Sequence, residues 1–196
     1  MKHATFLPLP TLQGPTLTLR PLHPDDFEAL YQSAADPLVW EQHPSRLRYQ
    51  RPVFEAYFAG AIASGSALAV IDHQTGQLVG CSRYYDWNEA GREIAIGYTF
   101  LARSHWGGTA NAELKKLMLD YAFQWVDTVW FHIGPENWRS RRAVEKIGGQ
   151  YSHQGLHVMP NRTEEVVFYT IRSSRYLEEQ KTRSFDSSIL INQPKS

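Results

Sequence analysis

The stretch that decides the fold is Ala102–Val126, which reads ARSHWGGTANAELKKLMLDYAFQWV. It places an aromatic residue and two glycines, Trp106–Gly108, directly before an amphipathic run. Lys115 and Lys116 belong to the polar side of that run. Apolar residues recur at three- and four-residue spacing on the other side and predict a helix with one buried face. They are Leu114, Leu117, Met118, Tyr121, Ala122 and Trp125.

A small-residue turn that opens onto a helix suits an anion. The first backbone N–H groups of a helix have no partner within it, and in such a turn they point at one place. The helix dipole adds only ~0.3–1 kcal/mol, so several converging N–H donors must provide most of the selectivity. The preceding segment Arg92–Leu101 has the pattern of a strand. Taken alone, the WGG turn fits a plain tight turn as well as it fits a pyrophosphate site.

A second strand–helix unit follows the first. Thr128–Gly134 is apolar enough for a buried strand, and Asn137–Gly149, NWRSRRAVEKIGG, predicts a helix. Asn137 is its expected N-cap, and Gly148 or Gly149 ends it. Two adjacent strands that diverge, each followed by a helix start, would leave a cleft for an extended ligand.

The remaining pattern predicts one mixed domain. We expect the order β-α-α-β-β-β-α-β-α-β-β, an α+β (mixed α/β) fold whose twisted mixed sheet of about six to seven strands carries helices on both faces. Residues 1–15 are expected to be an extended leader, 16–172 the domain, and 173–196 a polar, loosely docked tail. The predicted strands outside the two units are 16–22, 66–72, 77–87, 150–156 and 164–172, and the predicted helices are 23–36 and 53–63.

Composition excludes several classes of protein. The chain has 196 residues, 42% of them hydrophobic, and a formal net charge of zero, so wholesale binding to nucleic acid is not expected. No apolar run approaches eighteen residues, which predicts no membrane span, and the proline-broken N-terminus does not resemble a signal peptide. A single cysteine, Cys81, permits no internal disulfide and favours a cytoplasmic location.

The two units together resemble the GNAT superfamily of acetyl-CoA-dependent N-acetyltransferases. The resemblance rests on the strand, the WGG turn, the helix, the next strand and the pattern N-x-x-S-x-x-A-x-x-K-x-G that begins at Asn137. The subgroup that includes the ribosomal-protein N-terminal acetyltransferases is the most similar, because LTLRPLHPDDFEAL (residues 17–30) resembles its first strand and helix. The resemblance runs from about Thr16 to Arg172.

The resemblance implies an acetyl-CoA cleft between splayed strands and assigns residues to it. The turn amides would hold the pyrophosphate, the strand before the turn would pair with the pantetheine arm, and Asn137 would contact that arm. Ser140 matches a serine proposed to assist the leaving thiolate. The cofactor-binding residues predicted in this way are Phe100, Leu101, Ala102, Trp106, Gly107, Gly108, Thr109, Ala110, Asn137 and Ser140.

The chain also departs from the family pattern. In the turn motif only Gly107 is kept, since Ser104 and Thr109 occupy the other two signature positions. Val144 stands where many relatives have a tyrosine as general acid, and Ala95 stands where the subgroup often has a glutamate. These departures weaken any particular assignment of a general acid or base more than they weaken the prediction that the chain binds acetyl-CoA.

Transfer to an amine requires a neutral nucleophile, a stabilised carbonyl oxygen and a departing thiolate. Glu93 is the predicted base, because alternation places it on one strand face with Ala95 and Gly97; a surface glutamate beside Arg92 is the other interpretation. Ser140 is expected to orient a water or hydrogen-bond the sulfur, or to serve only the helix start. Tyr98 alternates to the opposite face, which favours core packing.

Other candidate groups were weighed on the same grounds. Arg139, Arg142 and Lys146 share a helix side that could meet a CoA phosphate or face solvent. No metal site is expected, because His153 and His157 have no third ligand nearby in the sequence. Cys81 has no activating neighbour, which favours direct transfer over a covalent acetyl-cysteine. The acceptor is expected to meet two segments, the loop 40–43 and the aromatic residues Tyr84, Tyr85 and Trp87.

These patterns predict an N-acetyltransferase that acts on a primary amine, either a protein N-terminus or a small molecule, in a ternary complex with acetyl-CoA. The alternative is an acyl-CoA-binding or interaction module of the same fold that has lost its chemistry. A nucleotide hydrolase of the P-loop type is disfavoured, because no Lys-Ser/Thr pair follows the glycines. A homodimer is an open alternative to a monomer.

Overall fold

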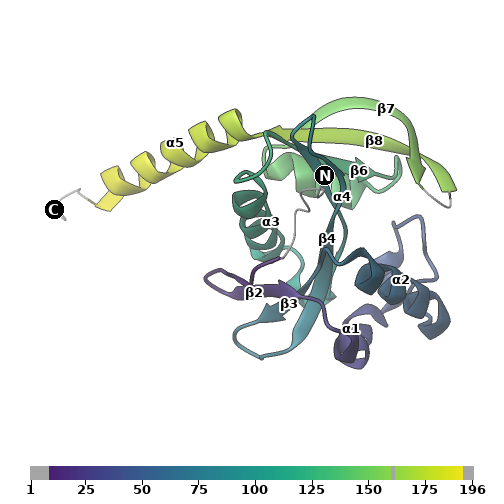
Figure 1. Ribbon diagram of the computed structural model, residues 1–196. Coiled ribbons are helices and arrows are strands. Elements are labelled where there is room, and N and C mark those ends of the chain that lie inside the picture. The colour runs from purple at the N-terminus through teal and green to yellow at the C-terminus, as the bar shows by residue number, and fades with distance from the viewer. Residues whose placement is uncertain (1–8, 160–161, 192–196) are drawn as a thin grey trace, which may run out of the picture.

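The computed structural model describes residues 9–159 and 162–191, which form a mixed sheet of eight strands with helices on both faces (Figure 1). The strand order is β1-β2-β3-β4-β5-β6-β8-β7. In chain order the strands are β1 (Leu12–Gln13), β2 (Leu17–Pro21), β3 (Ala67–Asp72), β4 (Leu78–Asn88), β5 (Glu93–Leu101), β6 (Thr128–Ile133), β7 (Gln150–Met159) and β8 (Arg162–Arg172).

Five α-helices connect or follow these strands in the described part of the chain. Short 3-10 turns precede α1 and α3 and lie between α1 and α2. The helices are α1 (Phe27–Ala34), α2 (Arg51–Ser64), α3 (Ala110–Ala122), α4 (Trp138–Lys146) and α5 (Ser173–Ile191). The predicted element order is thus confirmed between residues 16 and 172, and the structure adds β1 and α5 to it.

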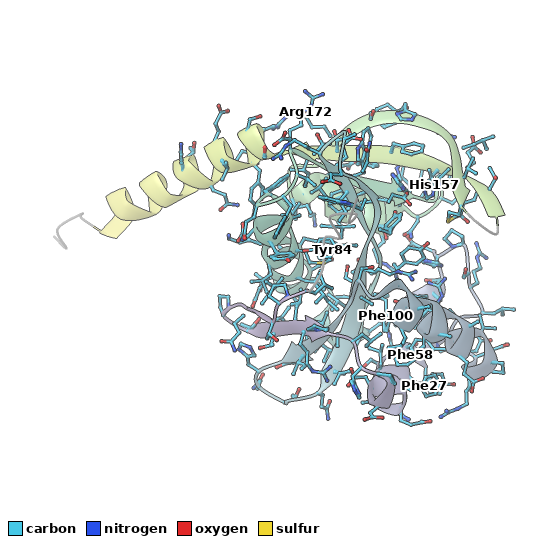
Figure 2. The ribbon with its side chains drawn as sticks, in the orientation of Figure 1. Phe27, Phe58, Tyr84, Phe100, His157 and Arg172 are labelled. Carbon is cyan, nitrogen blue, oxygen red and sulfur yellow. The ribbon has the colours of Figure 1, made fainter. Side chains whose placement is uncertain are left out.

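Two apolar cores lie on opposite faces of the sheet, because successive residues of a strand point to opposite sides. On β3, Leu68 and Val70 join the core beneath α3. Ala67 joins the core beneath α1 and α2. The second core is rich in aromatic rings: Phe27 meets Phe58 edge-on with centroids 5.2 Å apart, and Phe100 of β5 belongs to the same core (Figure 2).

The parallel pairing of β5 with β6 is short, and this creates the cleft. Residues 93–95 pair with residues 128–130, and the register ends at Ala95 and Trp130. Three residues further on, Tyr98 has a φ of +53°, a left-handed conformation that a regular strand does not contain. The pairing of β4 with β5 also shifts register between Cys81 and Arg83. The predicted splay between the two strands is therefore present.

Helix α3 differs from its predicted amphipathic pattern at one important position. Lys115, expected on the polar side, is buried with only 5% of its surface exposed. Trp125, expected in the core, lies beyond the helix end and is 47% exposed. The reason is tertiary: α3 packs against the diverging strands with a wider stripe than the sequence spacing indicates. Its buried residues are Leu114, Lys115, Met118, Leu119 and Ala122.

The chain termini contain two elements that the sequence pattern did not predict. Residues 1–8 of the expected leader lie outside the described residues, but Leu12 and Gln13 form β1 and pair with β2. The expected tail begins with α5, which leaves the end of β8 and projects from the domain (Figure 1). Its first turns dock, because Tyr176 is buried and its hydroxyl donates to Asp120 at 2.7 Å.

No helix in the described ranges has the length and apolar character needed to cross a bilayer.

Candidate active site

A cleft of about 670 Å³ opens where β5 and β6 diverge. Its walls are Ile96–Leu101 of β5, Phe131–Ile133 of β6 and the first turns of α3 and α4. Residues 39–44, between α1 and α2, close one side. The cleft is therefore built by the two strand–helix units that the sequence pattern singles out.

The WGG turn borders this cleft and is shaped for close approach of a ligand. Gly107 has a φ of +75°, a conformation that other residues rarely adopt. Nothing lies within 4 Å of the position where a Cβ would be on Gly107 or Gly108. Both glycines line the cleft directly before α3, so the helix start can accept an anion as the sequence predicts.

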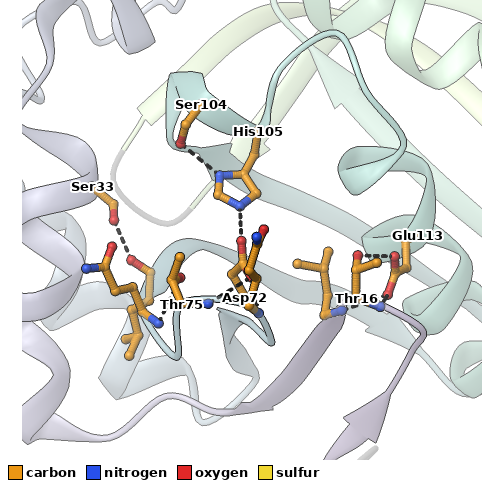
Figure 3. Close-up of polar contacts among 11 residues, drawn as sticks. Thr16, Ser33, Asp72, Thr75, Ser104, His105 and Glu113 are labelled. Carbon is orange, nitrogen blue, oxygen red and sulfur yellow. Dashed lines mark hydrogen bonds and ion pairs between the residues drawn. The ribbon is translucent and has the colours of Figure 1, made fainter.

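Side chains on both sides of the turn hold it against the sheet (Figure 3). His105 Nε2 donates to Asp72 Oδ2 at 2.7 Å, and this bond holds the pKa of the Asp72 carboxyl below its usual range. At the helix side, Glu113 accepts hydrogen bonds from the backbone N–H groups of Thr16 and Leu17, both at 2.8 Å. The WGG turn and the start of α3 are thus tied to β2 and β3.

The start of α4 forms the facing wall. Asn137 is buried, and its side-chain oxygen accepts a hydrogen bond from the Ser140 N–H at 3.2 Å. The predicted N-cap is confirmed, and both residues line the cleft. Arg139 places its guanidinium 4.1 Å from the centre of the Trp106 ring and donates to the Val39 carbonyl at 2.7 Å. Arg139 therefore joins the turn, α4 and the loop before α2.

Lys115 lies at the floor of the cleft. Its Nζ donates to Thr99 Oγ1 at 2.6 Å and lies 5.6 Å from the centre of the Phe131 ring. Burial lowers the pKa of Lys115 to about 7. This residue connects α3 with both diverging strands, yet nothing in its sequence neighbourhood distinguishes it from the exposed Lys116.

The other end of the cleft collects aromatic and imidazole side chains. Tyr85 packs so closely on Gly97 that a Cβ there would meet its ring at 2.8 Å. Its hydroxyl lies 3.1 Å from His132 Nδ1. Burial and the neighbouring His157 lower the pKa of His132 to about 4. Tyr98, which has a left-handed backbone, lines the cleft and also packs, partly buried, against the core beneath α1 and α2.

The structure brings together most of the predicted cofactor residues. Those that line the cleft are Phe100, Leu101, Trp106, Gly107, Gly108, Asn137 and Ser140. The cleft lining does not include Ala102, Thr109 or Ala110, which complete the turn around it. Arg139, Arg142 and Lys146, for which a solvated face was the alternative, all border the cleft.

The two predicted catalytic residues have different placements. Ser140 lines the cleft, whereas Glu93 stands at the first residue of β5, opposite Thr128, and 3.5 Å from the Asn88 amide nitrogen. Four residues separate Glu93 from Gly97, which corresponds to about 13 Å along a strand. The cleft lining does not include Glu93.

Only some residues of the two predicted acceptor segments line the cleft. Trp40, His43 and Tyr85 line the cleft, but Tyr84 is fully buried and its hydroxyl donates to the Met118 carbonyl at 2.7 Å. The cleft lining does not include Trp87. Polar residues at this site that the sequence pattern did not single out include Thr99, Lys115 and His132.

The fold and the cleft together define an acyltransferase of the splayed-strand type, and comparison with known proteins agrees. A model of the acetyltransferase (GNAT) domain matches residues 16–150, more than half of the chain. The chain belongs to the GNAT acetyltransferase family, which confirms the resemblance seen in its sequence. A search of curated proteins finds no match.

Solved structures show the same fold. A GCN5-related N-acetyltransferase from Brucella melitensis aligns with a TM-score of 0.77 at 20% identity, covering 88% of this chain and 82% of the other. A GNAT-family acetyltransferase from Bacillus anthracis gives 0.67 at 19% identity, covering 83% and 98%. Mycobacterium smegmatis RimJ, in complex with CoA-disulfide, gives 0.62 at 20% identity, covering 85% and 88%.

Proposed function

We propose that this protein transfers an acetyl group from acetyl-CoA directly to a primary amine, within a ternary complex. The observation that carries the proposal is the cleft that opens where the β5–β6 register ends, with the Gly107–Gly108 turn at one end. Strand β5 is free of β6 beyond Ala95, so its backbone can pair with an extended pantetheine arm. The pyrophosphate would lie on the turn and the start of α3.

The carbonyl oxygen of the acetyl group needs a hydrogen-bond donor as negative charge develops on it. The backbone N–H groups around Gly97 and Tyr98 are the proposed donors, because the irregular backbone there lies beyond the end of the β5–β6 pairing and lines the cleft. The Tyr98 carbonyl is already engaged, because it accepts the Tyr57 hydroxyl at 2.8 Å. This bond holds the irregular backbone at Tyr98 in place.

Ser140 is proposed to hydrogen-bond the sulfur as the thiolate leaves. Its backbone is fixed by the Asn137 cap, and it lines the cleft from the first turn of α4. A serine hydroxyl is a poor proton donor at neutral pH, so orienting a water or stabilising the sulfur is the role that suits it. The position of Glu93 at the far end of β5 gives no support to its predicted role as base.

Direct transfer is favoured over a covalent acetyl-enzyme. Cys81 is buried in the core beneath α1 and α2, and burial raises the pKa of its thiol to about 11. The thiolate is the nucleophile in any such intermediate, so this cysteine is poorly suited to attack. The cleft lining does not include Cys81.

The test is release of free CoA from acetyl-CoA with a panel of primary amines, among them peptides with free N-termini and small polyamines. Turnover on at least one amine, with CoA binding weakened by a Gly107 substitution, supports the proposal. An acyl-CoA-binding module is the second candidate, favoured by Val144 in the cleft wall where relatives carry an acid. Tight CoA binding without turnover on any amine would favour that module.

A further inference from the structure

Two histidines and one aspartate converge beside the acceptor end of the cleft. His157 Nε2 lies 2.7 Å from Asp86 Oδ2, and His132 Nδ1 lies 3.7 Å from the same oxygen. All three ligand-type atoms lie within 4.8 Å of one another. Each comes from a different strand: Asp86 from β4, His132 from β6 and His157 from β7.

From this convergence we propose that Asp86, His132 and His157 bind a divalent transition-metal ion, with zinc as the favoured ion. A tetrahedral zinc site has ligand bonds of about 2.0–2.2 Å, which places its ligand atoms about 3.3–3.5 Å apart. The two distances to Asp86 lie on either side of that value. Small rotations of the side chains would therefore bring the three atoms onto one ion.

The chemistry of the ligands selects the class of metal. Imidazole nitrogens with one carboxylate suit zinc, nickel, copper and cobalt, whereas calcium and magnesium prefer sets made of oxygen atoms. The Tyr85 hydroxyl lies 3.1 Å from His132 Nδ1, so it is a candidate for the fourth position once its hydrogen bond to that nitrogen gives way to the ion. A water molecule or an acceptor group could also take that position, since both histidines line the cleft.

The surroundings hold the ligands in position. The side chains of His132 and His157 are 9% and 11% exposed, and their ring centres are 4.2 Å apart. Phe168 of β8 packs against His132 with centroids 4.8 Å apart. Asp86 has a φ of +51°, an unusual conformation for a residue other than glycine, and it occurs where β4 departs from regular pairing with β5.

A metal here would join strands that the sheet does not pair. Strands β5, β6 and β8 lie between β4 and β7 in the sheet order, so the ion would connect the centre of the sheet to its edge. His157 lies on the arch of the β7–β8 hairpin (Figure 2). The bridge would fix that hairpin beside the cleft. The sequence pattern does not reveal this arrangement, because the third ligand is near in space but distant along the chain.

The experiment uses the full chain, stripped of metal with a chelator and titrated with Co²⁺ and Zn²⁺ in the absence of CoA and amine. We expect one equivalent of each ion to bind, with visible absorption from the cobalt complex. His157→Gln and His132→Gln should each weaken binding by at least about 10-fold, and Asp86→Asn should do the same. His153→Gln is the matched control, because His153 lies on the same strand, stacks on Phe168 and lies outside the cluster.

The native protein provides a second measurement that does not depend on the folding of variants. Zinc should protect His157, but not His153, from diethyl pyrocarbonate, and it should raise the unfolding temperature reversibly. The proposal is overturned if the native chain takes up no stoichiometric metal, or if uptake persists in His157→Gln. It is equally overturned if these variants lose turnover while metal never binds, which would instead assign the cluster to proton transfer. Since the titration contains no CoA, its failure leaves the proposed acetyltransferase function untouched.

Discussion

Replacing the buried Lys115 with methionine should stabilise the protein at neutral pH. Burial lowers the pKa of this lysine from 10.5 to about 7, so the unfolded chain holds its proton more tightly than the folded chain does. One pKa unit corresponds to about 1.4 kcal/mol. The cost of burying the lysine is therefore about 4 kcal/mol at pH 7.

The direction of the Lys115 pKa shift determines how the effect of this lysine on stability depends on pH. Between pH 7 and 10.5 the unfolded state binds more protons than the folded state, so this group makes stability rise with pH. Its cost falls to about 1 kcal/mol at pH 9.5 and vanishes above the pKa of the unfolded chain. Methionine does not titrate, so at this position it adds no pH dependence to the stability. The difference between variant and native protein should accordingly shrink as pH rises.

Loss of the Lys115 ammonium group does not leave the Thr99 hydroxyl without hydrogen-bond partners. Thr99 Oγ1, which accepts a hydrogen bond from the Lys115 ammonium, also lies 2.7 Å from Ser82 Oγ and 3.4 Å from the Gly97 carbonyl oxygen. Methionine has a similar length and an apolar body that can pack against Phe131. The expected gain in the free energy of unfolding is thus close to the full electrostatic cost, less about 1 kcal/mol for the lost hydrogen bond.

Urea unfolding at pH 7.0, 8.3 and 9.5 measures the effect. Lys116→Met is the control: it changes the adjacent lysine, which is exposed and pairs with Asp120 at 2.6 Å, and it should alter stability by less than about 0.5 kcal/mol at every pH. The reasoning is refuted if Lys115→Met destabilises the protein at pH 7, or if its difference from the native protein does not narrow with rising pH.

Three further predictions concern the cleft and its supports. Gly107→Val should raise the Kd for CoA at least about 10-fold in calorimetry, because it forces a branched residue to a φ of +75°; Gly65→Val, at +61° at the C-cap of α2 and outside the cleft lining, should lower stability without changing that Kd. Asn137→Ala should lower the free energy of unfolding by about 1 kcal/mol, because the helix cap of α4 is lost. The same substitution should weaken CoA binding. A loss of stability with unchanged CoA binding would exclude a contact between Asn137 and the ligand. Cys81 should resist alkylation by iodoacetamide at pH 8 in the native state and react only on unfolding, and a trapped acetyl-Cys81 in mass spectra would contradict direct transfer.

The framework of the cleft was predictable because its signals are local. A small-residue turn, a periodic helix and an N-cap each depend on neighbours within about four residues. Gly107 and Asn137 were therefore identified correctly as positions in the turn and cap. The strand assignments succeeded for the same reason, since alternation is read from consecutive residues.

The polar chemistry of the cleft was not predictable in this way. Lys115 has the same immediate neighbourhood as Lys116, and only the packing of α3 over the diverging strands makes one buried and the other exposed. Alternation predicts core packing for Tyr98, and this residue does pack against the core beneath α1 and α2, but it also lines the cleft. Glu93 lies on β5, which lines the cleft, but at the end of this strand that is farther from the cleft.

The amino-acid sequence by itself thus determined the family, the order of elements between residues 16 and 172, and the turn that suits a pyrophosphate, because these properties come from periodicity and local backbone preference. Only the tertiary structure decided where β5 and β6 part, which lysine is buried, and that Asp86, His132 and His157 meet. Contacts between strands distant in sequence depend on the register and curvature of the whole sheet, and no local pattern records them.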